Sequence, residues 1–363
     1  MSTTGLTALA RQLRGMIRAG EDPLRQDAAF SRMALELFRL QFHANASYRR
    51  WVGARAAGPA GVSDWRDLPA VPASAFKETE LTSLPAPERT HVFHSSGTTQ
   101  HRPGRHFHGT ESLALYEDSL AAWFAPHLVP QAGPLTCLSL TPAPGAAPRS
   151  SLAHMFGVIR HRHGDHHSSF LGTAGEDGWT VEAAAVKRCL NLAGDDDRPV
   201  LLAGTAFNFV HLLDGLAGEG THFRLPAGSR VMETGGYKGR SRELPRAELH
   251  AAITARLGVP YTHIVSEYGM SELSSQAYDL VAGQSGPRAF RFPPWARALV
   301  VSPETGREAA EGETGRLRIV DLANVWSVAA VQTDDLAVRR DDGFELVGRA
   351  PAAEPRGCSL LAT

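Results

Sequence analysis

Residues 261–272 read Tyr-Thr-His-Ile-Val-Ser-Glu-Tyr-Gly-Met-Ser-Glu. The first five residues form a short β-type run, and residues 267–272 follow it with carboxylates, an aromatic ring and a hydroxyl. Ligands of open α/β sheets bind beyond the carboxyl ends of the strands. A ring, a hydroxyl and a carboxylate at that place suit a base, a phosphate and Mg²⁺. A turn that ends a strand and leaves a glutamate on the surface explains this stretch alone equally well.

The chain on the amino-terminal side of this stretch alternates between strand and helix patterns. Helical spacing begins at Thr110, at Thr180 and after Pro245, where the pattern stops before Gly258. This alternation predicts an α/β sheet. The other short β-type runs of this part are residues 135–140, 200–203 and 229–233.

The composition and the hydrophobic spacing of the sequence change along the chain and predict four regions. The first 57 residues have helical spacing, and residues 58–90 are rich in proline. After residue 290, short strands alternate with Gly-containing turns. We therefore expect a helical region packed on the core (1–90), an α/β core (91–289), a β-rich subdomain (290–349) and a C-terminal tail (350–363).

Composition excludes several classes of protein. With 21% charged residues and a formal net charge of −1, the 363-residue chain has no basic excess that would predict nucleic-acid binding. It has no apolar stretch long enough to span a membrane and no export signal, so we expect a cytoplasmic protein. Its three cysteines, Cys137, Cys189 and Cys358, are widely spaced and odd in number, which favours reduced thiols.

Two loops combine glycine with cations. The first is Ser95-Ser96-Gly97-Thr98-Thr99, followed by Arg102 and Arg105. Its amide and hydroxyl donors suit a polyphosphate, although a solvated Ser/Thr-rich turn remains open and the loop is not of the Walker type. The second is Gly235-Gly236-Tyr237-Lys238, which follows the run at 229–233. Its glycines permit close approach of a ligand, but a plain hairpin remains open.

A histidine cluster, His-Arg-His-Gly-Asp-His-His at residues 161–167, is compatible with a Zn²⁺ site. Gly164 disfavours a helix that would align the ligands, and no second cluster completes a site. We expect a solvated loop without a functional role.

Taken together, the loops resemble the AMP-forming ligase superfamily of acyl-CoA synthetases, peptide-synthetase adenylation domains and luciferases. Three segments of this chain match motifs of the superfamily in the same order. Residues 96–99 resemble its phosphate loop, residues 235–236 its adenine-contacting turn and residues 268–272 its Tyr-Gly-x-Thr-Glu motif. Two further segments match downstream: residues 332–336 resemble the ribose-binding segment, and residues 344–349 resemble the strand that ends in Gly-Arg. The resemblance implies the large N-terminal domain of the adenylate-forming fold, with the core at 91–289 as the adenylating unit.

Within the superfamily, residues 236–243, 267–275 and 356–360 look like the LuxE-type acyl-protein synthetases of bacterial luminescence. In that family a fatty acid is adenylated and then moved to a cysteine near the C-terminus, from which a partner reductase receives it. The resemblance implies that the phosphates of ATP are held by Ser95, Ser96, Gly97, Thr98 and Thr99. It implies that adenine meets the turn Gly235-Gly236 and stacks on Tyr268, which Gly269 follows in the nucleotide-binding motif. Ser271 would approach the α-phosphate and Glu272 would hold Mg²⁺. Asp335 would bind ribose, Arg349 would lie beside the ribose or phosphate, and Cys358 would accept the acyl group.

Three departures from the superfamily pattern matter. The lysine that normally follows the proline of the phosphate loop is absent, which leaves Arg102, Arg105 and His106 as substitutes. Where the superfamily usually has Gly-Asp, this sequence has Asp334-Asp335. The sequence ends soon after Arg349, without the C-terminal domain that normally supplies a catalytic lysine, so Lys238 becomes the candidate cation.

Three functions stay open. The first is an acyl-protein synthetase that loads Cys358, whose neighbour Arg356 favours the thiolate; an ordinary small residue in a terminal strand is the alternative for Cys358. The second is an acid ligase that delivers the acyl group to coenzyme A or a carrier protein. The third is a non-catalytic subunit with the adenylate-forming fold.

Overall fold

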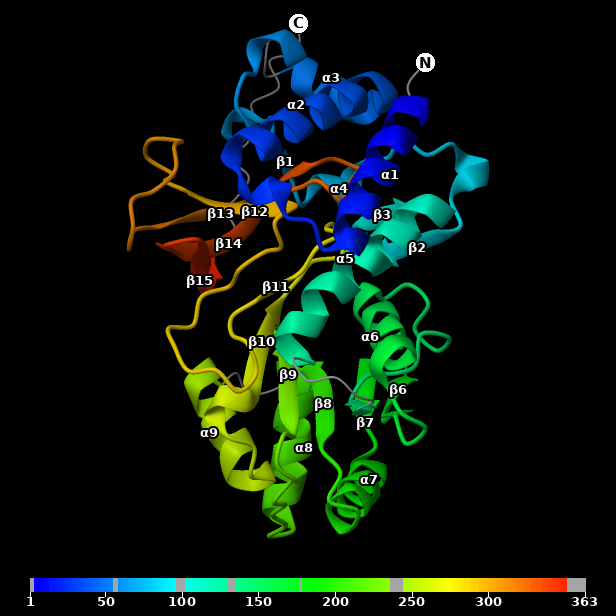
Figure 1. Cartoon of the computed structure of the whole chain (residues 1–363), viewed down its shortest axis with the longest axis vertical. Coiled ribbons are helices and arrows are strands. Elements are labelled where there is room, and N and C mark those ends of the chain that lie inside the picture. The colour runs from blue at the N-terminus through cyan, green and yellow to red at the C-terminus, as the bar shows by residue number, and fades with distance from the viewer. Residues whose placement is uncertain are drawn as a thin grey trace, which may run out of the picture.

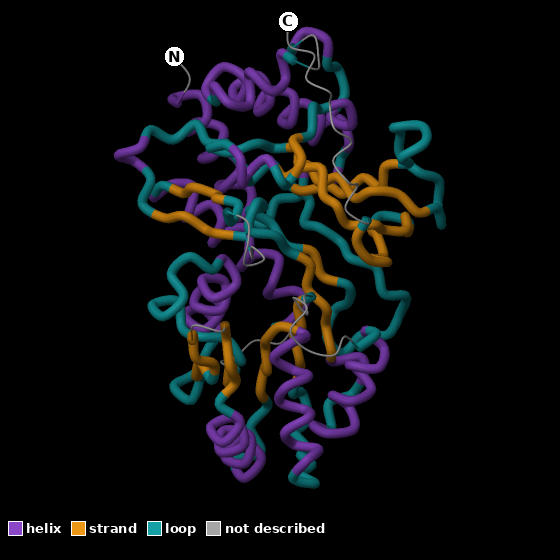
Figure 2. The backbone as a smooth tube through the Cα atoms, turned by 180° about the vertical axis from the view of Figure 1, so that it is seen from behind, coloured by secondary structure: helices purple, strands orange, loops and turns teal. Residues whose placement is uncertain are grey.

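Two β-sheets, one above the other, organise the molecule (Figure 1; Figure 2). The computed structural model describes residues 3–54, 58–95, 102–129, 135–175, 178–235 and 244–350. The helices are α1 (Thr3–Ala19), α2 (Asp27–Ala44), α3 (Ala46–Gly53), α4 (Ala75–Glu78), α5 (Thr110–Leu128), α6 (Ser151–His163), α7 (Ala183–Asp195), α8 (Ala206–Gly218) and α9 (Arg246–Leu257). The strands are β1 (Val71–Pro72), β2 (His91–His94), β3 (Arg105–His108), β4 (Thr136–Ser139), β5 (Ser169–Phe170), β6 (Gly172–Gly175), β7 (Gly178–Val181), β8 (Val200–Thr205), β9 (Arg230–Thr234), β10 (Ile264–Tyr268), β11 (Ala277–Tyr278), β12 (Ala296–Val301), β13 (Thr314–Asp321), β14 (Ala330–Arg340) and β15 (Gly343–Arg349).

The first sheet has the order β11-β10-β9-β8-β4-β5, and all of its neighbours are parallel except the edge pair β10–β11. Helices cover both faces. In β8, Val200 and Leu202 pack in the core formed with α7, α8 and α9, whereas Leu201 and Ala203 pack toward α5 and α6. Every residue of β8 is therefore buried, as expected for a central strand of a parallel sheet.

The second sheet has the order β1-β14-β13-β12, with β15 also paired to β14. The N-terminal helices share its core: Leu37 and Phe38 of α2 lie in one cluster with Leu317 and Ile319 of β13. In addition, Gln41 of α2 is fully buried and hydrogen bonds the turn before β14. The N-terminal helices therefore lie at one end of the molecule and α7, α8 and α9 at the other (Figure 1).

The α/β class expected from the sequence is confirmed, and several element positions are corrected. The strand expected at 261–265 begins only at Ile264, because Tyr261–His263 forms a 3₁₀ turn after Pro260. Thr180 belongs to β7, which pairs with β6, so α7 starts three residues later than expected. The division at residues 90, 289 and 349 stays a prediction.

The prediction of a loop at residues 161–167 is wrong for residues 161–163. Helix α6 continues through His163 and ends there, because Gly164 is its C-cap. At its other end, the Ser150 side chain accepts a hydrogen bond from the amide of Ala153. Glycine here ends a helix rather than preventing one.

No helix in the described part of the chain is both long and apolar enough to cross a lipid bilayer.

Candidate active site

Tyr268, the last residue of β10, joins the two sheets. Its Oη donates a hydrogen bond to Oδ2 of Asp335 on β14, at 2.7 Å. The other carboxylate oxygen of Asp335 accepts from Nε of Arg349, at 3.0 Å, where β15 pairs with β14. Burial and the neighbouring Asp335 raise the pKa of Tyr268 well above its usual value, so the phenol stays protonated. A hydroxyl, a carboxylate and a guanidinium thus meet beyond the end of a parallel strand.

Aromatic side chains surround Tyr268. Its ring centroid lies 5.4 Å from that of Phe344, 6.0 Å from that of Phe290 and 6.2 Å from that of Phe292. These rings come from β15 and from the segment before β12. They hold the Tyr268 ring in place on one side and make the wall apolar, which suits a planar base.

Gly269 follows Tyr268 and allows the chain to turn tightly. A Cβ atom at this position would lie 2.3 Å from Oε1 of Glu267. Any larger residue would therefore displace Glu267, whose burial raises its pKa to about 7.

Ser271 rests against the strand that leads into the Ser95 loop. Its Oγ donates to the carbonyl of His94 at 3.0 Å, and it lies 3.4 Å from Oγ of Ser151, the first residue of α6. The carbonyl of Ser271 accepts from Nδ1 of His106 at 2.8 Å. The serine of the 268–272 motif is therefore fixed between β2, β3 and α6.

Ser95 and Gly104 close the base of the glycine-rich loop. The amide of Ser95 donates to the carbonyl of Gly104 at 3.0 Å, and the amide of Gly104 donates to Oγ of Ser95 at 2.8 Å. A Cβ atom on Gly104 would lie 2.9 Å from Oγ of Ser95 and 3.0 Å from Oε1 of Glu272. The carboxylate of Glu272 therefore lies at the mouth of this loop, where the sequence predicts phosphate and Mg²⁺.

Asp321 and Asn324 hold the segment that carries Glu272. The side chain of Asn324 donates to the carbonyl of Glu272 at 2.9 Å. Asp321 accepts from the Ser274 amide and from Ser275 Oγ, each at 2.8 Å. Burial raises the pKa of Asp321 to about 6, although these hydrogen bonds oppose the shift. This buried network attaches the β10–β11 connection to the end of β13.

Lys77 is a charged residue that sequence reasoning missed. Burial raises the pKa of Glu272, while a hydrogen bond from its own backbone and the positive charges of Lys77 and Arg349 oppose this shift. Lys77 lies on α4, next to Phe76, whose Cβ is 3.4 Å from the same Cβ position on Gly104. The one feature of the sequence that could have pointed to Lys77 is the rarity of lysine, because the sequence contains only three lysines.

The predicted site residues are distributed as follows. Ser95, Gly269, Ser271, Glu272, Asp335 and Arg349 gather around the end of β10, and exposed Gly235 follows β9, the neighbour of β10. Asp334 is exposed, whereas Asp335 is 9% exposed and points to Tyr268. Ser96, Gly97, Thr98, Thr99, Gly236, Lys238 and Cys358 lie outside the described residues.

The suggestion that His106 replaces the missing lysine of the loop is wrong. Its side chain is 3% exposed, and burial lowers its pKa to about 4. His106 is therefore neutral near pH 7 and supplies no positive charge. Arg105 is paired with Glu80 at 3.3 Å.

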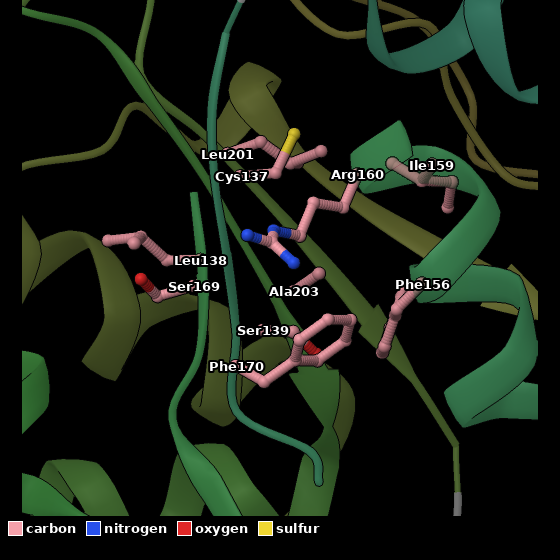
Figure 3. Close-up of a pocket in the computed structure, with 10 residues that line it drawn as sticks. All are labelled: Cys137, Leu138, Ser139, Phe156, Ile159, Arg160, Ser169, Phe170, Leu201 and Ala203. Carbon is pink, nitrogen blue, oxygen red and sulfur yellow. The ribbon is translucent and has the colours of Figure 1, made fainter. Parts of the chain in front are cut away.

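A small apolar pocket lies between α6 and strands β4, β5 and β8. Phe156, Ile159, Phe170 and Ala203 line it, together with Cys137. Figure 3 shows these side chains around the pocket, with the Arg160 guanidinium among them. Burial raises the pKa of Cys137 to about 12, so this thiol is a poor nucleophile.

Known proteins resemble this chain in sequence. Residues 184–363 match the family model of the acyl-protein synthetase LuxE. A curated relative, the long-chain-fatty-acid–luciferin-component ligase of Vibrio harveyi, is 23% identical over 356 residues, which cover 91% of this chain and 86% of that protein.

Solved structures show the same fold. A 2-hydroxyisobutyryl-CoA ligase with its adenylate and CoA, in the thioesterification state, superposes with a TM-score of 0.62 at 16% identity over 87% of this chain. An open conformation of that ligase gives 0.64 at 15% identity over 89%. The chain spans 64% and 69% of the lengths of these two chains. Over residues 184–363 it is similar to the LuxE-type acyl-protein synthetases, and it has the fold of these adenylate-forming ligases.

Proposed function

We propose that this protein uses ATP to convert a long-chain fatty acid into an acyl-adenylate and then transfers the acyl group to Cys358. The main support is the convergence of Tyr268, Asp335 and Arg349 with Glu272 beside Ser95. These residues lie at one end of a parallel sheet, where ligands of such sheets bind, and this position supports a nucleoside-binding and a phosphate-binding role for them.

The nucleoside part of ATP fits the Tyr268 side of the site. We assign adenine to the face of Tyr268 and to the Gly235-Gly236 turn, because β9 and β10 are adjacent. Asp335 is held by Tyr268 and Arg349, so its carboxylate is already oriented to accept hydrogen bonds from ribose hydroxyls. Arg349 is 83% exposed, so its Nη atoms can meet a phosphate oxygen while its Nε stays on Asp335.

The phosphates and Mg²⁺ fit the Glu272 side. The described residues contain no group of three or more acidic, His or Cys side chains that could hold a metal alone. Mg²⁺ commonly uses one or two carboxylates together with substrate phosphates, so a single glutamate beside the phosphate loop suits it. When bound, the metal would neutralise charge on the phosphates.

Lys77 is our candidate for the cation that assists adenylation, beside Lys238. Its charge acts on Glu272, and its helix is fixed because Ala73 donates to the carbonyl of Gln332 at 2.9 Å. Gln332 lies on β14, the strand that also carries Asp335. Lys77 is thus attached to the same strand as the ribose-binding residue.

The reaction has two balanced steps. In the first, a carboxylate oxygen of the acid attacks the α-phosphorus of ATP, the bond to the bridging oxygen breaks, and pyrophosphate leaves. In the second, the thiolate of Cys358 attacks the acyl carbon, the bond to the AMP oxygen breaks, and AMP leaves; the thiol proton passes to solvent. The first step needs positioning and charge stabilisation but no nucleophile from the protein.

We assign the alkyl chain of the acid to a path along α6 that ends at the apolar pocket, which at about 10 Å³ would have to open to admit the chain. Helix α6 begins beside Ser271, and its residues Phe156 and Ile159, which line the pocket, follow Ser151. At a rise of 1.5 Å per residue, they lie roughly 8–12 Å farther along the helix. A carboxylate at Ser271 could therefore direct its chain along α6 toward Ala203 and Phe170.

Incubation with ATP, Mg²⁺ and a panel of acids, followed by pyrophosphate assay and intact mass measurement, tests the proposal. We expect pyrophosphate release with long-chain acids and an acyl mass adduct that is absent in Cys358→Ala. Adenylate without an adduct would favour delivery to coenzyme A or a carrier protein instead. An absence of pyrophosphate release with every acid would favour the non-catalytic alternative. A reductase or carrier protein would receive the acyl group from Cys358.

A further inference from the structure

Asp118 on α5 is the centre of a charge cluster that the adenylation site does not use. Its side chain is 5% exposed. Arg14 and Arg18 of α1 both donate Nε to Oδ2 of Asp118, Arg18 at 2.8 Å. Arg162 of α6 donates Nη2 to Oδ1 at 3.1 Å. The carboxylate therefore fixes three guanidinium groups from two other helices.

The cluster has an excess of positive charge and unused donors. Three guanidinium groups share the single carboxylate of Asp118. The nearby Glu117 is hydrogen bonded to His154 at 2.9 Å, and the charge of Arg162 also lowers its pKa, so this carboxylate offsets part of the excess. Within the described ranges, the Nη atoms of Arg14 and Arg18 make no hydrogen bond. Held by Asp118 through Nε, both arginines keep these donors for another acceptor.

A hollow of about 270 Å³ lies against this cluster. Its polar side is lined by Arg18, Arg162, His163 and the carboxylate of Asp118, which the arginines neutralise, and its apolar side by Ile17, Ala121 and Ala122. Nε2 of His163 is buried and has no hydrogen-bond partner among the described residues. Buried polar atoms without partners are rare in folded proteins, and this one lies on a residue that borders the hollow.

We propose that this hollow between α1, α5 and α6 binds a small phosphate monoester that has a short apolar group. A phosphate monoester carries a charge of about −1.5 to −2 at pH 7, so it gains more from the excess of guanidinium charge than a singly charged anion does. Its oxygens would accept from Arg18 and Arg162, and its apolar group would contact Ile17 and Ala122. This site is separate from the residues around Tyr268 and Glu272 and does not depend on their proposed reaction.

Calorimetric titration of the full chain tests the proposal, with AMP present in excess to fill the nucleotide site. The probes are butyl phosphate and butyl sulfate, which share shape and apolar group but differ in charge. We expect saturable binding of one butyl phosphate per chain and clearly weaker binding of butyl sulfate. Arg18→Gln should weaken butyl phosphate binding roughly tenfold, because one charge-assisted contact is lost.

Arg11→Gln is the matched control, because Arg11 lies on the same helix, is 74% exposed and pairs with Glu111 instead of Asp118. It should leave binding unchanged, and Arg18→Lys should retain most of it. Circular dichroism checks that each variant is folded. Absence of saturable binding in the AMP-loaded wild type would overturn the proposal without any variant. Equal affinity of the two probes, or equal losses in Arg18→Gln and Arg11→Gln, would also overturn it.

Discussion

Tyr268 Oη donates a hydrogen bond of 2.7 Å to Asp335 Oδ2, and this contact joins the end of the parallel sheet to the central strand of the second sheet. Both residues are buried, at 7% and 9% exposure. The phenol therefore orients a carboxylate that cannot turn freely, while Arg349 holds its other oxygen. Pre-orientation of this kind lowers the entropy cost of binding a ribose.

We expect Asp335→Asn to raise the KM for ATP roughly tenfold or more, since a charge-assisted hydrogen bond contributes about 1.5–3 kcal/mol. ATP–pyrophosphate exchange at varied ATP gives the KM. Asp334→Asn is the matched control, because this neighbour is exposed. A similar KM in the two variants would remove Asp335 from the nucleotide site.

Glu272→Gln should lower the rate of pyrophosphate exchange by roughly 10²-fold and shift the Mg²⁺ requirement to higher concentration, because the carboxylate beside the phosphates is lost. Glu219→Gln serves as control, since Glu219 forms an exposed pair with Lys187. An unchanged Mg²⁺ titration in Glu272→Gln would show that the metal is bound elsewhere.

The three lysines allow a complete panel of single substitutions. We expect Lys77→Met to reduce kcat for adenylation by roughly 10²-fold, the usual effect of removing one group that stabilises transition-state charge. Lys187→Met should have no effect, because its partner Glu219 lies on the surface. Full activity of Lys77→Met together with an inactive Lys238→Met would assign the role to Lys238 alone.

Ala203→Phe should shift the preference toward shorter acids. The larger ring would fill the apolar pocket between Phe156 and Phe170, and loss of room for even one methylene changes specificity about tenfold or more. Competition between acids of different chain lengths measures the shift. If the preferred length stays the same, the alkyl chain does not enter this pocket.

His106 makes stability depend on pH. Its pKa is about 4 in the folded protein and 6.5 as an unperturbed imidazole, so the unfolded chain binds the proton more readily between these values. The part of the free energy of unfolding that depends on His106 is present above pH 6.5. It decreases by about 3 kcal/mol as the pH falls toward 4, for a pKa shift of this size. Denaturant unfolding from pH 7 to 4 should show a steeper decline for wild type than for His106→Gln. If the free energies of unfolding of wild type and His106→Gln declined in parallel with pH, this expectation would be contradicted.

Local sequence patterns predicted most of the elements near the site. The parallel strands and the helices α5 and α9 follow periodicities of a few residues, and Gly258 ends α9 with a φ of 71°. The strand at 261–265 was misplaced because Tyr261 and His263 are compatible with either a strand or a 3₁₀ turn. Helix α6 was missed because its polar last turn hid the helical period, and its end at Gly164 was interpreted as a loop.

The site was predicted where its residues lie in contiguous motifs. The Tyr268–Glu272 stretch and Asp335 were identified by resemblance and by their position after strands. Lys77 was not identified, because no local pattern relates α4 to Glu272; the packing of α4 follows from the pairing of β1 with β14 and from the contact of Phe76 at Gly104. His106 was assigned a charge that its burial removes.

By itself, the sequence determined the α/β alternation, the order of the motifs and the family resemblance, since these depend on neighbouring residues and on their spacing along the chain. Only the tertiary structure decided that Asp335 rather than Asp334 meets Tyr268, that Lys77 acts on Glu272, and that three arginines share Asp118. The physical reason is that these contacts depend on strand register and helix packing, which the whole core sets together, and no local pattern encodes them.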